Sequence, residues 1–190
     1  MIMFFSVWRR ITFTEKDAHK LMSEKKISEL KLHGEYMNIL SCFPGIGKTY
    51  LFNNQEKYGL RILDSDSSNF SWIEKGKRNP AFPQNYIEHI KENMFKVDVI
   101  LVSTHKEVRE ALVANIHPKN LRFVVPPFTD IDVYIERYRK RGSSESFIKL
   151  LSDNWYDWIL DIVSSHRDSI WMLDTREYLS DLFDRVKFDN

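Results

Sequence analysis

Ser-Cys-Phe-Pro-Gly-Ile-Gly-Lys-Thr, at residues 41–49, lies between a short apolar run, residues 38–40, and a segment with helical character, residues 48–58. This strand–loop–helix context is the one that a phosphate-binding loop requires. Gly45 and Gly47 have no Cβ atom, so the backbone can curl tightly and aim its N–H groups at an anion. The helix that follows would add further unpaired N–H groups and the positive end of its dipole.

The end of this stretch carries the side chains that a bound nucleotide needs. Lys48 supplies a positive charge for the β- and γ-phosphates of ATP, and the Thr49 hydroxyl can ligate Mg²⁺. The usual pattern is G-x-x-x-x-G-K-[ST], and Cys42 stands at its first glycine. A turn that needs glycine for geometry alone would not explain the Lys-Thr pair. The residues expected around the phosphates are Pro44, Gly45, Ile46, Gly47, Lys48 and Thr49.

Length and composition indicate one globular domain. The chain has 190 residues, a formal net charge of +1 and a single cysteine. A charge this close to zero offers no broad attraction to nucleic acid or to a membrane surface. One cysteine excludes an internal disulfide framework and fits a reducing compartment. The apolar N-terminus lacks the basic start and cleavage site of a signal peptide, so we expect a cytoplasmic protein. The oligomeric state stays open.

Residues 1–36 differ from the rest of the chain. They contain a Lys/Glu-rich segment, residues 14–34, with only a thin apolar stripe, and Met37 stands directly before the first apolar run. We therefore predict an N-terminal extension over 1–36, which we hypothesise to be dispensable, and a phosphate-loop domain over 37–190.

From residue 38 onward, apolar segments alternate with helical ones. The predicted strands are residues 38–42, 60–63, 97–103, 121–125 and 170–173. The predicted helices are residues 48–58, a helix from Pro83, 106–116, 130–141, 144–166 and a last helix capped by Thr175. A polar loop is expected over 67–82. This alternation predicts an α/β fold of three layers, a P-loop NTPase fold with a five-stranded parallel sheet flanked by helices.

An acidic pair follows the second predicted strand. Asp64 and Asp66 are two residues apart, so on an extended chain both carboxylates face one side. One could hold a water of the Mg²⁺ shell, and the other could orient an attacking hydroxyl or accept its proton. The alternative is a solvated turn, because Asp and Ser are common turn formers. Asp64 is the predicted metal partner of Thr49.

Arginines gather at the end of the helix predicted over 130–141. Phosphoryl transfer spreads negative charge over the transferring oxygens, and positioned arginines stabilise it. Arg137 and Arg141 share one helical face, whereas Arg139 points elsewhere. A helix ending in glycine and serines can act as a lid. The alternative is a solvated, cationic helix C-terminus.

The predicted polar loop contains three candidates for acceptor binding. Arg78 could clamp a phosphate, since its guanidinium suits bidentate contact, although a plain basic loop explains it equally. Phe70 and Trp72 could stack on an acceptor ring, or could form a local hydrophobic cap. Cys42 carries a further hypothesis: beside a helix N-terminus its thiol would favour the thiolate, unless it is buried and inert.

Taken together, these motifs resemble the small P-loop kinases of the nucleoside monophosphate kinase (adenylate-kinase-like) group, with shikimate- and gluconate-kinase-like members. The chain is also similar to adenylate-kinase-like proteins encoded by bacteriophages. The resemblance covers residues 37–190 and implies strand order 2-3-1-4-5, ATP and Mg²⁺. It implies that Lys48 and Thr49 contact phosphate and metal, that Asp64 or Asp66 orients the acceptor or the metal shell, and that Arg137 and Arg141 are lid arginines. Where many such proteins have an acid after the third strand, this sequence has Ser103.

The resemblance implies an enzyme, a nucleotide kinase that moves the γ-phosphoryl group of Mg-ATP to a nucleoside or deoxynucleoside monophosphate. The expected partner is thus a small molecule rather than a membrane. Because the charge balance offers no basic surface excess, modification of a nucleic acid is the weakest alternative. The acidic pair also suits an alcohol acceptor, as in shikimate- or gluconate-kinase-like members. The missing acid after strand three leaves a third alternative, a nucleotide-binding module without catalysis.

Overall fold

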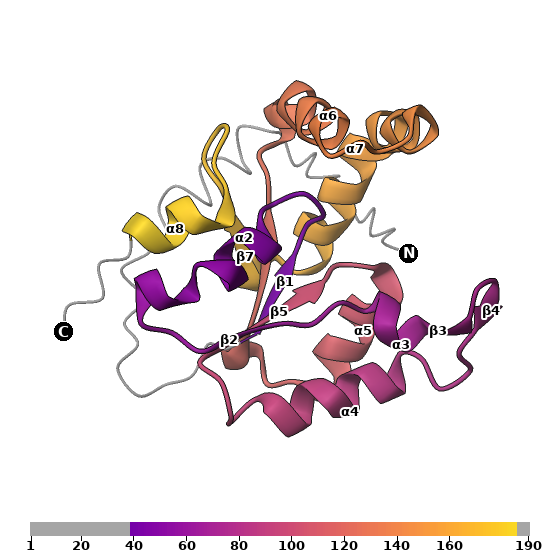
Figure 1. Cartoon of the computed structure of the whole chain (residues 1–190), viewed down its shortest axis with the longest axis vertical. Helices are drawn as coiled ribbons and strands as arrows, with labels where there is room; N and C mark the ends of the chain where they lie inside the picture. The colour runs from indigo at the N-terminus through magenta and orange to yellow at the C-terminus, as the bar shows by residue number, and fades with distance from the viewer. Residues whose placement is uncertain (1–38, 186–190) are drawn as a thin grey trace, which may run out of the picture.

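The structure is a computed structural model that describes residues 39–185, in which one parallel sheet is covered by helices on both faces (Figure 1). The predicted extension over 1–36 and Met37 lie outside the described residues. The strands of the sheet are β1 (Ile39–Cys42), β2 (Ile62–Asp64), β5 (Val99–Ser103), β6 (Leu121–Val125) and β7 (Ile170–Met172).

The strands lie in the order β2-β5-β1-β6-β7, and all neighbouring pairs are parallel. Numbered along the chain within this sheet, the order is 2-3-1-4-5, so the predicted fold class and strand order are confirmed. Every residue of β1 is buried, because other strands cover both of its edges and helices cover both of its faces. The carboxyl ends of all five strands meet at one edge, and the bend at residues 43–47 leaves β1 there.

Helices flank the sheet on both sides. α2 (Lys48–Asn53) and α8 (Leu179–Arg185) lie side by side (Figure 1). The opposite face is covered by α4 (Gln84–Asn93), α5 (Lys106–Asn115) and α7 (Glu145–Ser165). There the buried Arg109 of α5 pairs with Asp161 of α7. Between β6 and α7, the 3-10 turn η4 (Phe128–Asp130) leads into α6 (Ile131–Lys140). Two further 3-10 turns are η3 (Pro118–Asn120) and η5 (Arg167–Ser169).

Three predicted elements differ in their secondary structure or in where a helix begins. The helix predicted over 48–58 is divided, since α2 ends at Asn53 and a 3-10 turn, η2 (Gln55–Tyr58), follows. The loop predicted over 67–82 contains α3 (Ser68–Ser71) and a hairpin of β3 (Trp72–Glu74) and β4 (Lys77–Arg78), which projects from the body in Figure 1. The last helix begins at Leu179 rather than after Thr175, because the Asp181 carboxylate accepts a hydrogen bond from the Tyr178 N–H at 2.7 Å.

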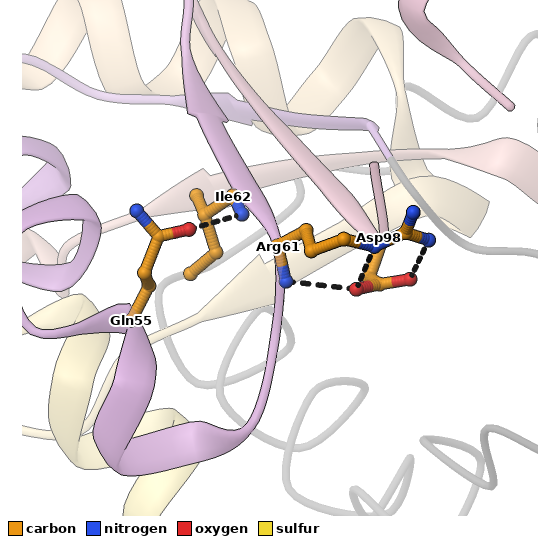
Figure 2. Close-up of polar contacts among 4 residues, drawn as sticks. All are labelled: Gln55, Arg61, Ile62 and Asp98. Carbon is orange, nitrogen blue, oxygen red and sulfur yellow. Dashed lines mark hydrogen bonds and ion pairs between the residues drawn. The ribbon is translucent and has the colours of Figure 1, made fainter. Parts of the chain in front are cut away.

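β2 begins two residues later than predicted, and side chains explain where it starts (Figure 2). The Arg61 N–H donates to the Asp98 carboxylate at 2.8 Å, and the Arg61 guanidinium binds the same group at 2.8 and 3.1 Å. The next N–H, that of Ile62, faces the open edge of the sheet and donates to Gln55 Oε1 at 2.7 Å. These contacts fix the edge strand that carries Asp64 at its end.

Candidate active site

The bend between β1 and α2 requires both of its glycines. Gly45 and Gly47 have φ angles of 80° and 104°, which residues with a Cβ atom rarely adopt. A Cβ atom on Gly45 would lie 3.0 Å from the hydroxyl oxygen of Tyr138, and one on Gly47 would lie 3.2 Å from Cδ1 of Tyr178. Glycine is therefore needed for the backbone angle and for the close approach of two aromatic side chains.

Backbone N–H groups of this bend are available to an anion. The Phe43 N–H donates to the Val124 carbonyl at 2.9 Å and fixes the start of the bend, and the Leu51 N–H donates to the Gly47 carbonyl at 3.1 Å. Within residues 39–185, the N–H groups of Gly45, Ile46 and Gly47 donate to no other backbone group. Successive unpaired amides of this kind form an anion-binding concavity.

A cavity of about 820 Å³ opens over the bend. Its walls are the bend with the start of α2, the carboxyl ends of β2 and β5, and α6 with the segment after β7. Most of the predicted site residues line it, namely Pro44, Gly45, Gly47, Lys48, Thr49, Asp64, Asp66, Arg137 and Arg141. Ile46 does not, because its side chain is completely buried in the core.

At the centre of the cavity, Thr49 and Asp64 form a pair of oxygen ligands. The Thr49 hydroxyl donates to Asp64 Oδ2 at 3.1 Å, and Lys48 precedes Thr49 on the cavity wall. Among the described residues, no cluster of three or more His, Cys, Asp or Glu side chains could hold a metal. Mg²⁺ does not need one, since it is bound by one or two protein oxygens together with substrate phosphates and water. The donors present fit Mg²⁺.

One side of the cavity is lined by carboxylates and by uncharged polar side chains. We call it the acidic flank, and it consists of Asp64, Ser65, Asp66, Ser67, Ser103 and His105. Asp66 Oδ1 accepts a hydrogen bond from the Ser68 N–H at 2.9 Å. The Ser103 hydroxyl is buried and lies beside the Tyr86 side chain. Desolvation lowers the pKa of His105 from its ordinary value, which favours the neutral imidazole.

The opposite side is rich in cations. This basic flank consists of Val133, Glu136, Arg137, Lys140, Arg141, Arg176 and Tyr178. Arg137 is its best-anchored residue. Its Nη2 donates to the carbonyls of Arg176 and Glu177 at 2.8 and 2.9 Å. Its guanidinium also lies over the Tyr178 ring, 3.6 Å from the ring centroid.

Other contacts tie the segment after β7 to the phosphate-binding bend. Asp130 is 1% exposed and accepts a hydrogen bond from the Arg176 N–H at 2.6 Å. Arg176 has a φ angle of 65°, which is uncommon for a residue with a side chain. The Leu179 N–H then donates to the Ile46 carbonyl at 2.9 Å. The basic flank is therefore held by residues from η4, α6 and the bend.

The three arginines at the end of α6 separate as their spacing predicts. Arg137 and Arg141, which directly follows α6, line the cavity, whereas Arg139 does not, and its Nε lies 3.7 Å from the Glu145 carboxylate. Arg137 uses Nη2 to hold the segment after β7, and its guanidinium also contacts the Tyr134 side chain. One guanidinium thus combines structural contacts with a place on the cavity wall.

The three acceptor candidates lie elsewhere. Arg78 pairs with Glu107 and stacks over Trp72 and Phe82, and it does not line the cavity. Phe70 packs on the rings of Tyr86 and His89. In this structure these contacts match the alternatives, a basic surface loop and a local hydrophobic cap. A role in acceptor binding would need the hairpin to move.

The hypothesis of a reactive Cys42 thiolate is wrong for this structure. Cys42 is completely buried, and burial raises the pKa of its thiol to about 12. The attraction of Lys48 acts in the opposite direction but is the smaller effect. Cys42 is therefore the buried, inert thiol of the alternative reading.

Sequence reasoning missed the residues that follow β7. Arg176 and Tyr178 line the cavity, and so does Lys140, which was not among the predicted site residues. Their position at the carboxyl edge of a parallel sheet, where ligands bind in α/β folds, was the signal that could have identified the first two. Tyr138 and Asp130, which support the site from the core, carry no such signal.

No protein-family model matches the sequence, and no curated protein matches it either. Among solved structures, a gluconokinase from Sinorhizobium meliloti 1021 is similar with a TM-score of 0.50 and 15% sequence identity, covering 79% of this chain and 88% of that one. The BceF tyrosine kinase domain aligns over 68% of this chain and 70% of its own length at 16% identity, but a TM-score of 0.31 is too low to support a common fold. The first likeness shows that this chain shares the overall α/β fold of that structure. No helix within the described residues is long and apolar enough to cross a membrane.

Proposed function

We propose that this chain is a phosphotransferase that moves the γ-phosphoryl group of Mg-ATP to a small acceptor. The observation that carries the proposal is the Thr49–Asp64 hydrogen bond beside a bend with unpaired amides. The bend binds the β-phosphate, Lys48 neutralises charge at the β- and γ-phosphates, and Thr49 with Asp64 faces the metal. Bound Mg²⁺ would supply a Lewis acid for the negative charge of the transferred phosphoryl group.

Nucleotide binding follows from the two flanks. Cations suit the triphosphate, and the half-exposed Tyr178 ring beside Gly47, which the Arg137 guanidinium covers on one face, suits contact with a nucleobase. These features support a nucleotide along the basic flank, with the acidic flank left to the acceptor. A nucleoside monophosphate is the acceptor that the sequence resemblance favours. The acidic pair, Asp64 and Asp66, favours the second candidate, a small alcohol.

Replacing the loop lysine tests the proposal. We expect Lys48→Ala to lower ATP-dependent phosphate transfer by about 100-fold or more, because the charge it supplies is greatest in the transition state. Turnover is measured with radiolabelled ATP, and Mg-ATP affinity by calorimetry. Lys96→Ala, at an exposed lysine outside the cavity, is the matched control. Tight binding of Mg-ATP with no turnover toward any acceptor or water would instead support a nucleotide-binding module, and absence of binding would exclude both.

A further inference from the structure

The two flanks differ in charge as well as in position. On the basic flank, four cations and one carboxylate line the cavity: Arg137, Lys140, Arg141, Arg176 and Glu136. The acidic flank contains two carboxylates, Asp64 and Asp66, and among the described residues that form it there is no Lys or Arg. Lys48 lies between the flanks and is required by the nucleotide phosphates.

This distribution decides which acceptor the acidic flank can hold. A phosphate monoester brings close to two negative charges, and proteins bind it through arginine, lysine or clustered amides. Two carboxylates would repel it, and the cation beside them, Lys48, is already required by the nucleotide phosphates. A hydroxyl group has no such requirement, because it can donate to a carboxylate and accept from a serine.

Nearby cations do not remedy the deficit. Arg78, the basic residue predicted to clamp an acceptor phosphate, is close enough for its charge to act on His105, but it is paired with Glu107 and does not line the cavity. Lys77 of the same hairpin lies 3.3 Å from the Glu74 carboxylate. Lys106, at the start of α5, is exposed and does not line the cavity either.

The acidic flank also contains a group that can take a proton. Asp66 is exposed, and its Oδ1 is occupied by the Ser68 N–H. Its second oxygen, Oδ2, accepts no hydrogen bond from the described residues, so it is open to an incoming hydroxyl. Ser103 adds a hydroxyl beside the Tyr86 side chain, on the strand between β1 and β2.

We propose that the acceptor is a hydroxyl compound without a phosphate group, bound at the acidic flank, and that Asp66 accepts the hydroxyl proton. This inference depends on the proposed function. In the reaction the acceptor oxygen forms a bond to the γ-phosphorus, the bond from that phosphorus to the β–γ bridging oxygen breaks, and ADP leaves. The proton moves from the hydroxyl to Asp66 and then to solvent, so the products are a phosphate monoester, ADP and a proton.

Paired acceptor panels test the acceptor class. The full-length protein is incubated with labelled Mg-ATP and either nucleoside monophosphates or the matching nucleosides, neutral sugars and polyols. Transfer to a member of the second panel, with none to the first, is the expected result. Transfer to any nucleoside monophosphate with equal or higher kcat/KM would overturn the inference while leaving the proposed function intact.

Hydrolysis of ATP tests the role of Asp66 even when the true acceptor is missing from both panels, because water is itself a hydroxyl nucleophile. If no acceptor is found, hydrolysis of Mg-ATP is compared for the unaltered protein, Asp66→Asn and the exposed α7 control Asp157→Asn. We expect Asp66→Asn alone to lower hydrolysis by about 100-fold while Mg-ATP affinity stays the same. An unchanged hydrolysis rate, or no hydrolysis above that of Lys48→Ala, would overturn the inference. Loss of Mg-ATP binding in the unaltered protein would reject the proposed function itself.

Discussion

The two flanks of the cavity differ in how the residues that face it are held. On the basic flank, Arg176 is bonded to Asp130, 46 residues away, and Arg137 reaches carbonyls 39 and 40 residues away. On the acidic flank, the backbone of Ser65 is also held by distant residues, since its N–H donates to the Leu101 carbonyl and its carbonyl accepts from Tyr86, whereas the Asp66 side chain is bonded, within the described residues, only to the N–H of Ser68, two residues away. A side chain held by long-range contacts is preorganised for one unchanging ligand, which the proposed function takes to be the nucleotide. A side chain with only a local contact can be exchanged with little effect on the rest of the fold.

The largest effect is expected on the acidic flank, at Asp64, which with Thr49 would hold Mg²⁺. Asp64→Asn keeps the volume of the side chain but removes the negative charge that would attract Mg²⁺, so we expect turnover to fall by about 100-fold and the Mg²⁺ requirement to rise. Thr49→Ser, which keeps the hydroxyl, is the matched control and should retain most activity. The measurement is turnover across a magnesium titration. Recovery of full activity at moderate magnesium would show that Asp64 does not face the metal.

A second effect, a loss of stability, is expected when an anchoring residue of the basic flank is replaced. Arg137→Ala removes two hydrogen bonds to carbonyls and a stacked guanidinium, so we expect a loss of about 2 kcal/mol in the free energy of unfolding. Arg139→Ala, two residues along the same helix, should change it by about 0.5 kcal/mol or less, since its ion pair is exposed. Urea denaturation measures both. Equal losses would mean that the basic flank is not held as the structure indicates.

The range of the contacts that fix each element also determines how far the sequence predicts the structure. The central strands and the phosphate-binding bend depend on local patterns, and β6 and α7 were predicted nearly to the residue for the same reason. The start of the edge strand was not, because Asp98, 37 residues from Arg61, determines it. The hairpin at residues 72–78 was missed because Trp72 and Ile73 are both exposed and give no alternating pattern.

For the site, the sequence predicted the parts that a motif contains. Lys48, Thr49 and Asp64 are close in the chain to strand ends and therefore could be placed at one edge of the sheet. Arg176 could not, since its position depends on a left-handed backbone angle and on Asp130. No local pattern encodes a contact between segments this far apart.

A smaller effect, a change of stability that depends on pH, is expected at the contact that supports the start of β2. The Arg61 side chain and N–H hold the pKa of Asp98 below its ordinary value of 3.8. A lowered folded-state pKa contributes stability above about pH 4, and this contribution is lost as pH falls through the folded-state value. Asp98→Asn should therefore be less stable than the unaltered protein at neutral pH, and the difference should shrink in acid. Asp168→Asn, at an exposed aspartate outside this contact, should show no such trend in denaturation midpoints.

The smallest effect distinguishes two buried tyrosines, one behind each flank. Tyr86 donates to the Ser65 carbonyl of the acidic flank at 2.6 Å, so Tyr86→Phe leaves a buried carbonyl with one partner fewer and should cost about 1 kcal/mol. The Tyr138 hydroxyl lies against Gly45, is buried, and has no hydrogen-bond partner in the described residues.

Removing the Tyr138 hydroxyl should therefore change the free energy of unfolding by about 0.5 kcal/mol or less, in either direction, because burial without a partner offsets the packing that the oxygen provides. Thermal denaturation of Tyr138→Phe and Tyr86→Phe without nucleotide gives the comparison. Repeating it with saturating Mg-ATP shows whether the hydroxyl acquires a partner, since a phosphate on the bend would be the nearest new acceptor. A loss near 1 kcal/mol in the nucleotide-free Tyr138→Phe variant would contradict the structure, because it would require a hydrogen bond that the described contacts do not contain.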